Sequence, residues 1–211
     1  MTYKTEQEAF WSGEFGDEYP NRNQGEEKVI SNVVLWGKIL NSAPQVKSIV
    51  ELGCNIGLNL QALNKINKDF ELHAYEINSN AASKAQALNI ANVTCDTILN
   101  PIQAEKTFDL TFTNGVLIHI DPAYLANVYQ NLYNLSHRYI MVCEYYNPSP
   151  VMVKYRGHDD RMFKRDFAGE LIDKFNLRLV DYGFVYHRDN YFPKDDLTWF
   201  LLEKQTQVNE V

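Results

Sequence analysis

The feature that most constrains the fold of this chain is a regular alternation of strand-like and helix-like segments. Apolar runs of strand length alternate with segments whose apolar residues have helical spacing. Strands separated by helices of about 10–15 residues are typical of parallel βαβ units. The expected strands are 46–52, 70–75, 93–95, 108–114 and 139–144, and the expected helices are 58–66, 79–88, 122–135 and 165–175.

The alternation stops after residue 175. Two extended segments, 177–187 and 197–202, follow one another with no helical pattern between them. Successive strands joined without a crossover helix favour antiparallel pairing. The sequence therefore predicts an α/β fold: a doubly wound, Rossmann-like, mostly parallel seven-stranded sheet that ends in an antiparallel pair.

The chain divides into three parts. Residues 1–25 carry Phe10, Trp11, Phe15 and Tyr19 among charged residues, and we interpret them as an aromatic arm or lid over a site, with packing against the sheet edge as the alternative. A helix is expected over 26–41, so the domain proper spans 26–204. The polar segment 205–211 is expected to be a flexible tail.

Composition narrows the class of protein. With 211 residues, 45% of them hydrophobic and 22% charged, the chain can close one core, and it fits neither a disordered protein nor a membrane protein. A formal charge of −7 disfavours nucleic acid as a partner. Cys54, Cys95 and Cys143 form no Cys-x-x-Cys pair, so we expect neither a disulfide framework nor a metal site. Unpaired cysteines suit a reducing compartment, so we expect a cytoplasmic location.

A glycine-containing turn follows the first strand directly. In Val50–Asn59, Gly53 and Gly57 supply the backbone freedom for a sharp strand-to-helix turn and for the close approach of a ligand. A tight structural turn would use the same glycines. In this strand order, however, the turn predicts a small-molecule cleft at the carboxyl end of the strand.

Acidic residues at the ends of the next strands indicate what the cleft holds. Glu76 ends the second strand, where a carboxylate can accept both hydroxyls of a ribose, and Asp96 follows the third, where it can accept from an exocyclic amine. Position 55 is Asn, so the phosphate-binding Gly-x-Gly-x-x-Gly form is absent. Glu51 before the turn suits a cationic ligand rather than pyrophosphate. A nucleoside-shaped, cationic ligand fits these positions.

These residues resemble the class I S-adenosylmethionine (SAM)-dependent methyltransferases. The family pattern Glu/Asp-x-Gly-x-Gly-x-Gly is matched at Glu51, Gly53 and Gly57 and broken at Asn55, which tolerates left-handed backbone. The resemblance implies SAM as cofactor, S-adenosylhomocysteine (SAH) as product and no metal. The cofactor-binding residues that it implies are Trp11, Glu51, Gly53, Cys54, Asn55, Gly57, Asn59, Glu76, Ile77, Asp96, Thr97, Asn114, Gly115 and Val116.

Longer segments resemble one smaller group, the methylases associated with pseudaminic acid biosynthesis. They are Phe10–Tyr19, Asn114–Ile120, Glu144–Pro148, Tyr155–His158, Phe163–Phe167, Asp181–Arg188 and Asp195–Phe200. This resemblance implies O- or N-methylation of a small anionic sugar or nucleotide-sugar of the nonulosonic acid type. The alternative acceptors are another small metabolite and a modified nucleotide. The alternative to an enzyme is an inactive subunit that binds SAM or SAH. We expect a monomer or a homodimer without a membrane partner.

Two histidines are candidate catalytic residues. A sugar hydroxyl benefits from a general base within roughly 2.6–3.2 Å of its proton. His119 follows the fourth strand, where cofactor and acceptor meet in this fold, and His187 ends the sixth. Support of the cofactor site is the alternative role for His119, and a surface turn is the alternative for His187.

The acceptor-binding candidates come from three segments. The aromatic residues and amide after the fifth strand suit a sugar ring, although they could equally be core. The arginines near residues 156–188 suit a carboxylate or phosphate, although they could equally be a solvated helix start. The arm could also reach the acceptor. The candidates are Tyr19, Arg22, Asn23, Tyr145, Tyr146, Asn147, Arg156, Arg165 and Arg188.

Overall fold

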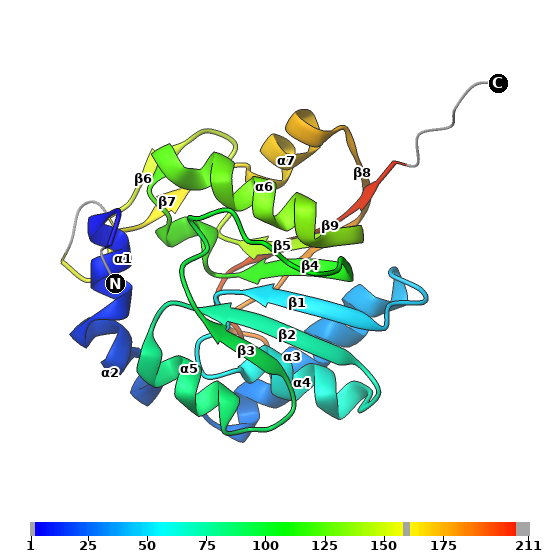
Figure 1. Cartoon of the computed structure of the whole chain (residues 1–211), viewed down its shortest axis with the longest axis horizontal. Helices are drawn as coiled ribbons and strands as arrows, with labels where there is room; N and C mark the ends of the chain where they lie inside the picture. Colours follow the sequence, from blue (N-terminus) through cyan, green and yellow to red (C-terminus); the bar gives the residue numbers. More distant parts are fainter. Residues whose placement is uncertain (1–2, 158–160, 206–211) are drawn as a thin grey trace.

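A seven-stranded sheet forms the middle layer of the computed structural model, which describes residues 3–157 and 161–205 (Figure 1). Its strands are β1 (Ser48–Leu52), β2 (Glu71–Glu76), β3 (Asn92–Cys95), β4 (Phe108–Asn114), β5 (Ser136–Glu144), β8 (Leu177–Phe184) and β9 (Thr198–Lys204). They lie in the order β3-β2-β1-β4-β5-β9-β8. The first five run parallel, and β9 runs antiparallel to both β5 and β8, which confirms the predicted sheet.

Helices cover both faces of the sheet (Figure 1). On one face lie α3 (Glu26–Asn41), α4 (Leu58–Ile66) and α5 (Ser79–Gln86), and on the other α6 (Leu125–Leu135) and α7 (Phe167–Phe175). Two short 3₁₀ turns, η1 (Leu117–His119) and η2 (Pro122–Tyr124), precede α6. Strand β1 lies between β2 and β4, so the chain reverses its direction across the sheet there. In such sheets the crevice at the carboxyl ends of these strands is the usual ligand site.

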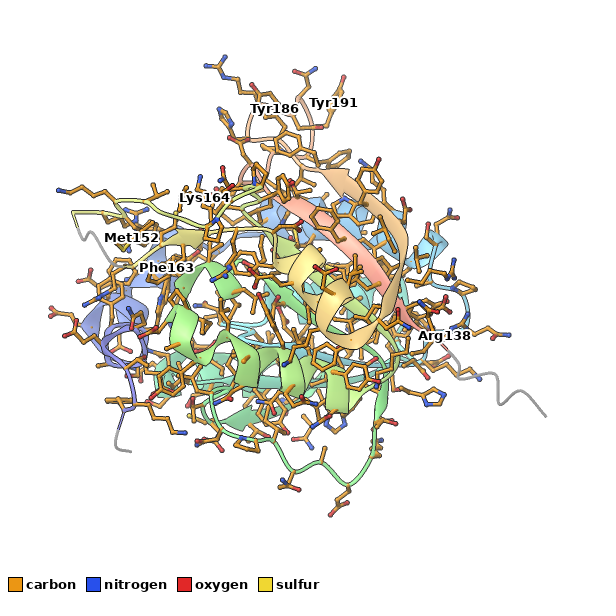
Figure 2. All side chains as sticks on the ribbon, turned by 90° about the horizontal axis from the view of Figure 1, so that it is seen from above. Arg138, Met152, Phe163, Lys164, Tyr186 and Tyr191 are labelled. Atoms are coloured by element: carbon orange, nitrogen blue, oxygen red, sulfur yellow. The ribbon has the colours of Figure 1, made fainter. Side chains whose placement is uncertain are left out.

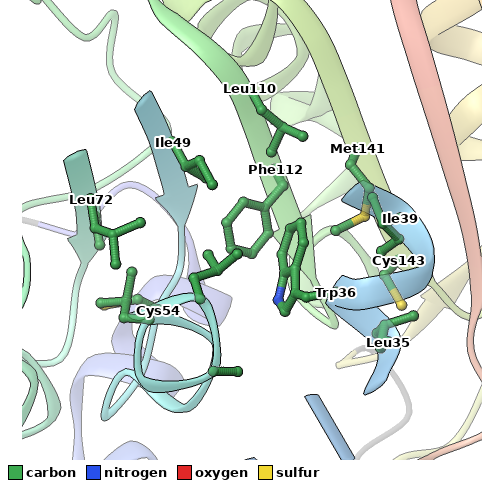
Figure 3. Close-up of a cluster of buried hydrophobic side chains, with 14 of the residues drawn as sticks. Leu35, Trp36, Ile39, Ile49, Cys54, Leu72, Leu110, Phe112, Met141 and Cys143 are labelled. Carbon is green, nitrogen blue, oxygen red and sulfur yellow. The ribbon is translucent and has the colours of Figure 1, made fainter. Parts of the chain in front are cut away.

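The larger core cluster fills the space between the sheet and α3–α4 (Figure 3). The fully buried Trp36 packs edge-on against Phe112 of β4, with ring centroids 4.6 Å apart. Ile49 of β1 belongs to this cluster, whereas Val50 and Leu52 belong to the cluster on the α6–α7 face. Because side chains alternate along a strand, Glu51 faces α3 and α4 with Ile49.

The expected aromatic arm is two short helices, α1 (Glu6–Ser12) and α2 (Glu14–Arg22), which we call the N-terminal cap. Thr5 caps α1 by accepting from the Glu8 N–H at 3.1 Å. The cap lies at the end of the sheet toward which β1, β2 and β4 point, beside the hairpin of β6 (Val151–Met152) and β7 (Phe163–Lys164) (Figure 1). Its aromatic rings therefore meet the carboxyl edge of the sheet.

The two C-terminal strands differ from expectation at their ends: β9, expected over 197–202, runs from Thr198 to Lys204. The strand predicted over 177–187 ends at Phe184, because both Asp189 and Lys194 donate backbone N–H bonds to the Tyr186 carbonyl and turn the chain. Residues 206–211 of the expected tail lie outside the described residues. Within the described part of the chain, none of the helices has the length and apolar character needed to cross a bilayer.

Candidate functional site

A cavity of about 880 Å³, counted out to its open mouth, lies between the cap and the carboxyl ends of β1, β2 and β4. Its wall brings together most of the predicted cofactor residues: Trp11, Gly53, Asn55, Glu76, Ile77, Asp96, Thr97, Asn114, Gly115 and Val116. The wall does not include the other four predicted cofactor residues, which are Glu51, Cys54, Gly57 and Asn59.

Glu51 lies behind the glycine turn rather than in the cavity. It faces α4, where its Oε1 accepts from the Asn59 amide at 2.6 Å. Asn59 also accepts from Trp36 Nε1 and from the Asn114 amide, so it links β1, α3 and β4. Burial raises the pKa of Glu51 to about 8, and its Oε2 has no hydrogen-bond partner among the described residues.

The turn after β1 uses left-handed backbone three times, at Gly53 (φ +84°), Asn55 (φ +49°) and Gly57 (φ +80°). Asn55 tolerates this conformation and accepts from the Ile56 N–H through its own side chain. At Gly53 an added Cβ would lie 2.7 Å from Val116 Cγ2. The turn thus keeps its shape without a middle glycine, and Val116 seals the space that Gly53 leaves.

Gly53→Ala should lower the free energy of unfolding more than Gly115→Ala does. Both glycines have positive φ, so both variants carry a backbone cost of about 1–2 kcal/mol. Only Gly53 adds a clash, worth about 1–3 kcal/mol, because a Cβ at Gly115 has no neighbour within 4 Å. Urea denaturation measures both values, and equal destabilisation would contradict the packing of Val116 on Gly53.

Glu76 is held by the loops on either side of it. Its Oε2 accepts from the Asn55 N–H at 2.7 Å, and its Oε1 accepts from the Asn78 N–H at 2.8 Å. Burial raises the pKa of Glu76, and these backbone bonds oppose that shift. A carboxylate has about four lone-pair positions, so it can still accept from a ligand in the cavity.

The cap is attached to the same wall by hydrogen bonds. Glu8 accepts from the Thr97 hydroxyl, and Asp17 accepts from the amides of Asn78 and Asn80 at 2.9 and 2.7 Å. At Gly16 an added Cβ would lie 1.7 Å from the Trp11 carbonyl oxygen, so only glycine allows this close packing. The cap therefore closes the side of the cavity next to β2 and β3.

The cavity wall is acidic. Glu8, Glu76, Asp96 and Asp121 contribute to it, and no Lys or Arg of the described residues does. The described residues also contain no group of three or more His, Cys, Asp or Glu side chains placed to hold a metal ion. The carboxylates favour a ligand that carries a positive charge.

His119 lies in the cavity wall with a defined proton position. Its Nδ1 is 2.7 Å from the Arg161 carbonyl oxygen. A carbonyl oxygen only accepts, so Nδ1 carries the proton and Nε2 is a bare acceptor. The ring lies between Trp11 and Tyr155, with centroid distances of 4.6 and 5.0 Å, and burial lowers its pKa to about 4.

We expect ¹⁵N NMR of the imidazole to show His119 neutral and protonated at Nδ1 from pH 8 down to about pH 5. Its inflection should fall near pH 4, far below the roughly 6.5 of a free histidine. Burial disfavours the charged ring in the folded state, so protonation of His119 favours unfolding. The free energy of unfolding is therefore unaffected by this group above about pH 6.5, and it falls as the pH drops from about 6.5 toward 4. An inflection near pH 6.5 would contradict the burial of the ring.

His187 is placed differently. It is exposed in the loop between β8 and β9, where its Nδ1 lies 2.8 Å from Asp196 Oδ1. It does not line the cavity. Figure 2 shows its neighbour Tyr186, with Tyr191, on a loop that extends away from the body of the protein. The structure therefore does not bring the two candidate histidines to one wall.

Of the three acceptor candidates in the cap region, only Tyr19 lines the cavity. Burial raises the pKa of its hydroxyl, and Tyr155, Asp195 and Tyr145 add to the shift. Arg22 lies over the Phe15 ring, and Asn23 accepts from Lys28 at 3.1 Å.

The candidate residues after β5 do not line the cavity. Lys164 lies 4.6 Å from the centre of the Tyr145 ring, and burial raises the pKa of Tyr145 to about 12. Tyr146 is half exposed beside Phe200, and Asn147 is bound to the Ser149 carbonyl. Figure 2 shows Lys164 beside Phe163 on the hairpin that follows.

The three candidate arginines lie in different segments and make different contacts. Arg156 lies 5.7 Å from the centre of the Tyr155 ring, Arg165 binds Glu170 at 2.5 Å, and Arg188 is exposed in the β8–β9 loop. None lines the cavity. His158, in the same segment as Arg156, lies outside the described residues.

Several wall residues were not predicted. Each lies within a few residues of a predicted site residue or of an aromatic residue of the cap, and this proximity in sequence was the signal that could have found them. They are Thr5, Gln7, Glu8, Gly16, Tyr75, Asn78, Ile98, Leu99, Ile120 and Asp121.

The chain is similar to known proteins in its three-dimensional structure only. No model of a protein family matches the chain, and no curated protein does. Magnesium protoporphyrin IX methyltransferase from Synechocystis PCC 6803 with bound SAH is 12% identical, with a TM-score of 0.68 over 94% of this chain and 97% of that one. The 1,6-didemethyltoxoflavin-N1-methyltransferase of Burkholderia thailandensis, with bound 1,6-didemethyltoxoflavin and SAH, is 13% identical, with a TM-score of 0.71 over 98% of this chain and 92% of that one.

A SAM-dependent methyltransferase from Clostridium acetobutylicum ATCC 824 is also similar, with 13% identity and a TM-score of 0.63 over 90% of this chain and 96% of that one. These structures span almost the whole chain, cap included in the longest match. The TM-scores establish the fold, and identities this low leave both the activity and the substrate open. The chain has the fold of the class I SAM-dependent methyltransferases.

Proposed function

We propose that this protein transfers the methyl group of SAM to a hydroxyl or amino group of a small anionic sugar or nucleotide-sugar of the nonulosonic acid type. The observation that carries the proposal is the single cavity in which Gly53, Glu76, Asp96 and His119 meet. It combines acidic residues at the ends of β2 and β3 with a bare imidazole nitrogen. SAM would supply a methyl group on a positively charged sulfur, which is transferred by in-line displacement.

The residues present fit that cofactor. The acidic wall suits the positive charge of the sulfonium, and Glu76 retains lone pairs for ribose hydroxyls. Glu51 behind the turn holds the turn in place through its bond to Asn59 of α4. Asp96 and Thr97, beyond β3, are the residues we assign to the adenine edge.

His119 is the residue that we assign to the acceptor. Its bare Nε2 can accept the proton of an acceptor hydroxyl, and the Nδ1 bond to a carbonyl keeps that nitrogen unprotonated. With a pKa of about 4 it is a weak base, so it orients the hydroxyl and receives its proton late in the displacement. An amine acceptor needs only to arrive neutral.

The support for a sugar with a negative charge is the group of side chains beyond His119. Tyr155 contacts the imidazole, and Tyr145 lies close enough to Tyr19 to affect its ionisation. Lys164 and Arg156 lie over the Tyr145 and Tyr155 rings. Aromatic faces suit the apolar face of a sugar, and the two cations suit a carboxylate or phosphate outside the acidic cavity.

Calorimetric titration tests the cofactor. SAM and SAH should both bind, and Glu76→Gln should weaken SAH by about 10- to 100-fold, because a charged hydrogen bond to a ligand is worth about 1.5–3 kcal/mol. Glu71→Gln, at the exposed start of the same strand, is the matched control and should change the affinity less than about twofold. Failure of the wild-type protein to bind either compound would overturn the proposed function.

Mass spectrometry tests the acceptor. Incubation with SAM should add the mass of one methylene group to a free or CMP-activated nonulosonic acid. For a hydroxyl acceptor, His119→Asn should lower kcat by about 10²- to 10⁴-fold, the usual contribution of a general base. A mass gain only on unrelated metabolites or nucleotides would reject the sugar, and SAH binding without transfer to any acceptor would favour an inactive binding subunit.

A further inference from the structure

Glu144, the last residue of β5, is a buried carboxylate to which the proposed reaction assigns no role. It is 3% exposed. Its Oε1 accepts from the N–H groups of Val116 and Leu117 at 3.1 and 3.2 Å, and its Oε2 accepts from Ile118 N–H at 3.4 Å. One side chain thus binds three successive backbone donors of a neighbouring loop.

That loop is the 3₁₀ turn η1, which ends at His119. The first N–H groups of any helical turn have no partner within the turn, and a turn of three residues has too few internal bonds to hold its own shape. Its own bonds include His119 N–H to the Val116 carbonyl and Ile120 N–H to the Leu117 carbonyl. Glu144 supplies from β5 the acceptors that the turn lacks.

The same turn carries two parts of the cavity wall. Val116 packs against Gly53 of the β1 turn, and His119 presents Nε2 as a bare acceptor. A shift of the turn would therefore move both at once. Glu144 does not line the cavity, and its hydrogen bonds reach the cavity wall through the turn.

We propose that Glu144 is a positioning residue for methyl transfer, which holds the Val116–His119 turn so that the imidazole keeps its place beside the acceptor. This inference rests on the proposed function. Both of its oxygens matter, because together they accept from all three N–H groups, whereas an amide offers one oxygen and turns an NH₂ group toward a donor. Arg165 and Tyr146 face the same small space on the α7 side.

The test is Glu144→Gln, with Glu203→Gln as the matched control. Glu203 lies on the adjacent strand β9 and binds Arg138 at the opposite edge of the sheet. We expect Glu144→Gln to lower kcat by about 10- to 100-fold, because a displacement of about 1 Å at a reacting group can cost about 10²-fold. Because the same shift moves Val116 against Gly53, the KM for SAM should rise as well, whereas Glu203→Gln should keep both kcat and KM within about twofold.

Hydrogen exchange separates this role from the proposed function. The amides of residues 116–118 should exchange at least about tenfold faster in Glu144→Gln than in Glu203→Gln, and the ¹⁵N shifts of His119 should move. Unchanged exchange and shifts, or a wild-type kcat, would overturn the role of Glu144. Absence of SAM binding by the wild type would instead overturn the proposed function. If Glu144→Gln does not fold, Glu144→Asp, which keeps the charge on a shorter side chain, should show the same effects at smaller size.

Discussion

Burial of three carboxylates at strand ends is the constraint on which the cavity depends. Glu51, Glu76 and Glu144 lie at or near the carboxyl ends of β1, β2 and β5, and each is less than a tenth exposed. A buried carboxylate is costly unless donors surround it, so each one fixes a nearby segment. Glu51 binds Asn59 of α4, while Glu76 and Glu144 bind backbone N–H groups of the adjoining loops. The cavity is the space between loops held in this way.

The alternating pattern was sufficient to predict the sheet and most of its elements, because apolar runs and helical spacing report burial directly. The structure ends α4 at Ile66 and begins β4 at Phe108, as the pattern predicts. The cap helices were not predicted, because Gly13 and Gly16 look like breaks in a short segment. In the structure Gly13 separates the two helices, and Gly16 allows α2 to pack on the Trp11 carbonyl.

Site residues could be predicted where the strand order alone fixes their position. They could not be predicted where the direction of a side chain or the path of a long loop fixes it. Residues at the ends of β2 and β4, such as Glu76 and Asn114, reach the cavity because parallel strands bring their ends to one edge. Glu51 precedes the turn by two residues, yet strand alternation directs it toward α4. His187 and Arg188 follow β8 in sequence, but their loop leads away from the cavity, and no periodicity reports the path of a loop.

The partner of His119 Nδ1 is a main-chain carbonyl, that of Arg161. Every amino acid supplies the same carbonyl, so no substitution at position 161 removes the atom that fixes the imidazole. The side chain there can diverge while the tautomer of the histidine is preserved. The orientation of the imidazole thus depends on the path of the backbone between β6 and β7, and insertions or deletions in that segment would change it more readily than point mutations.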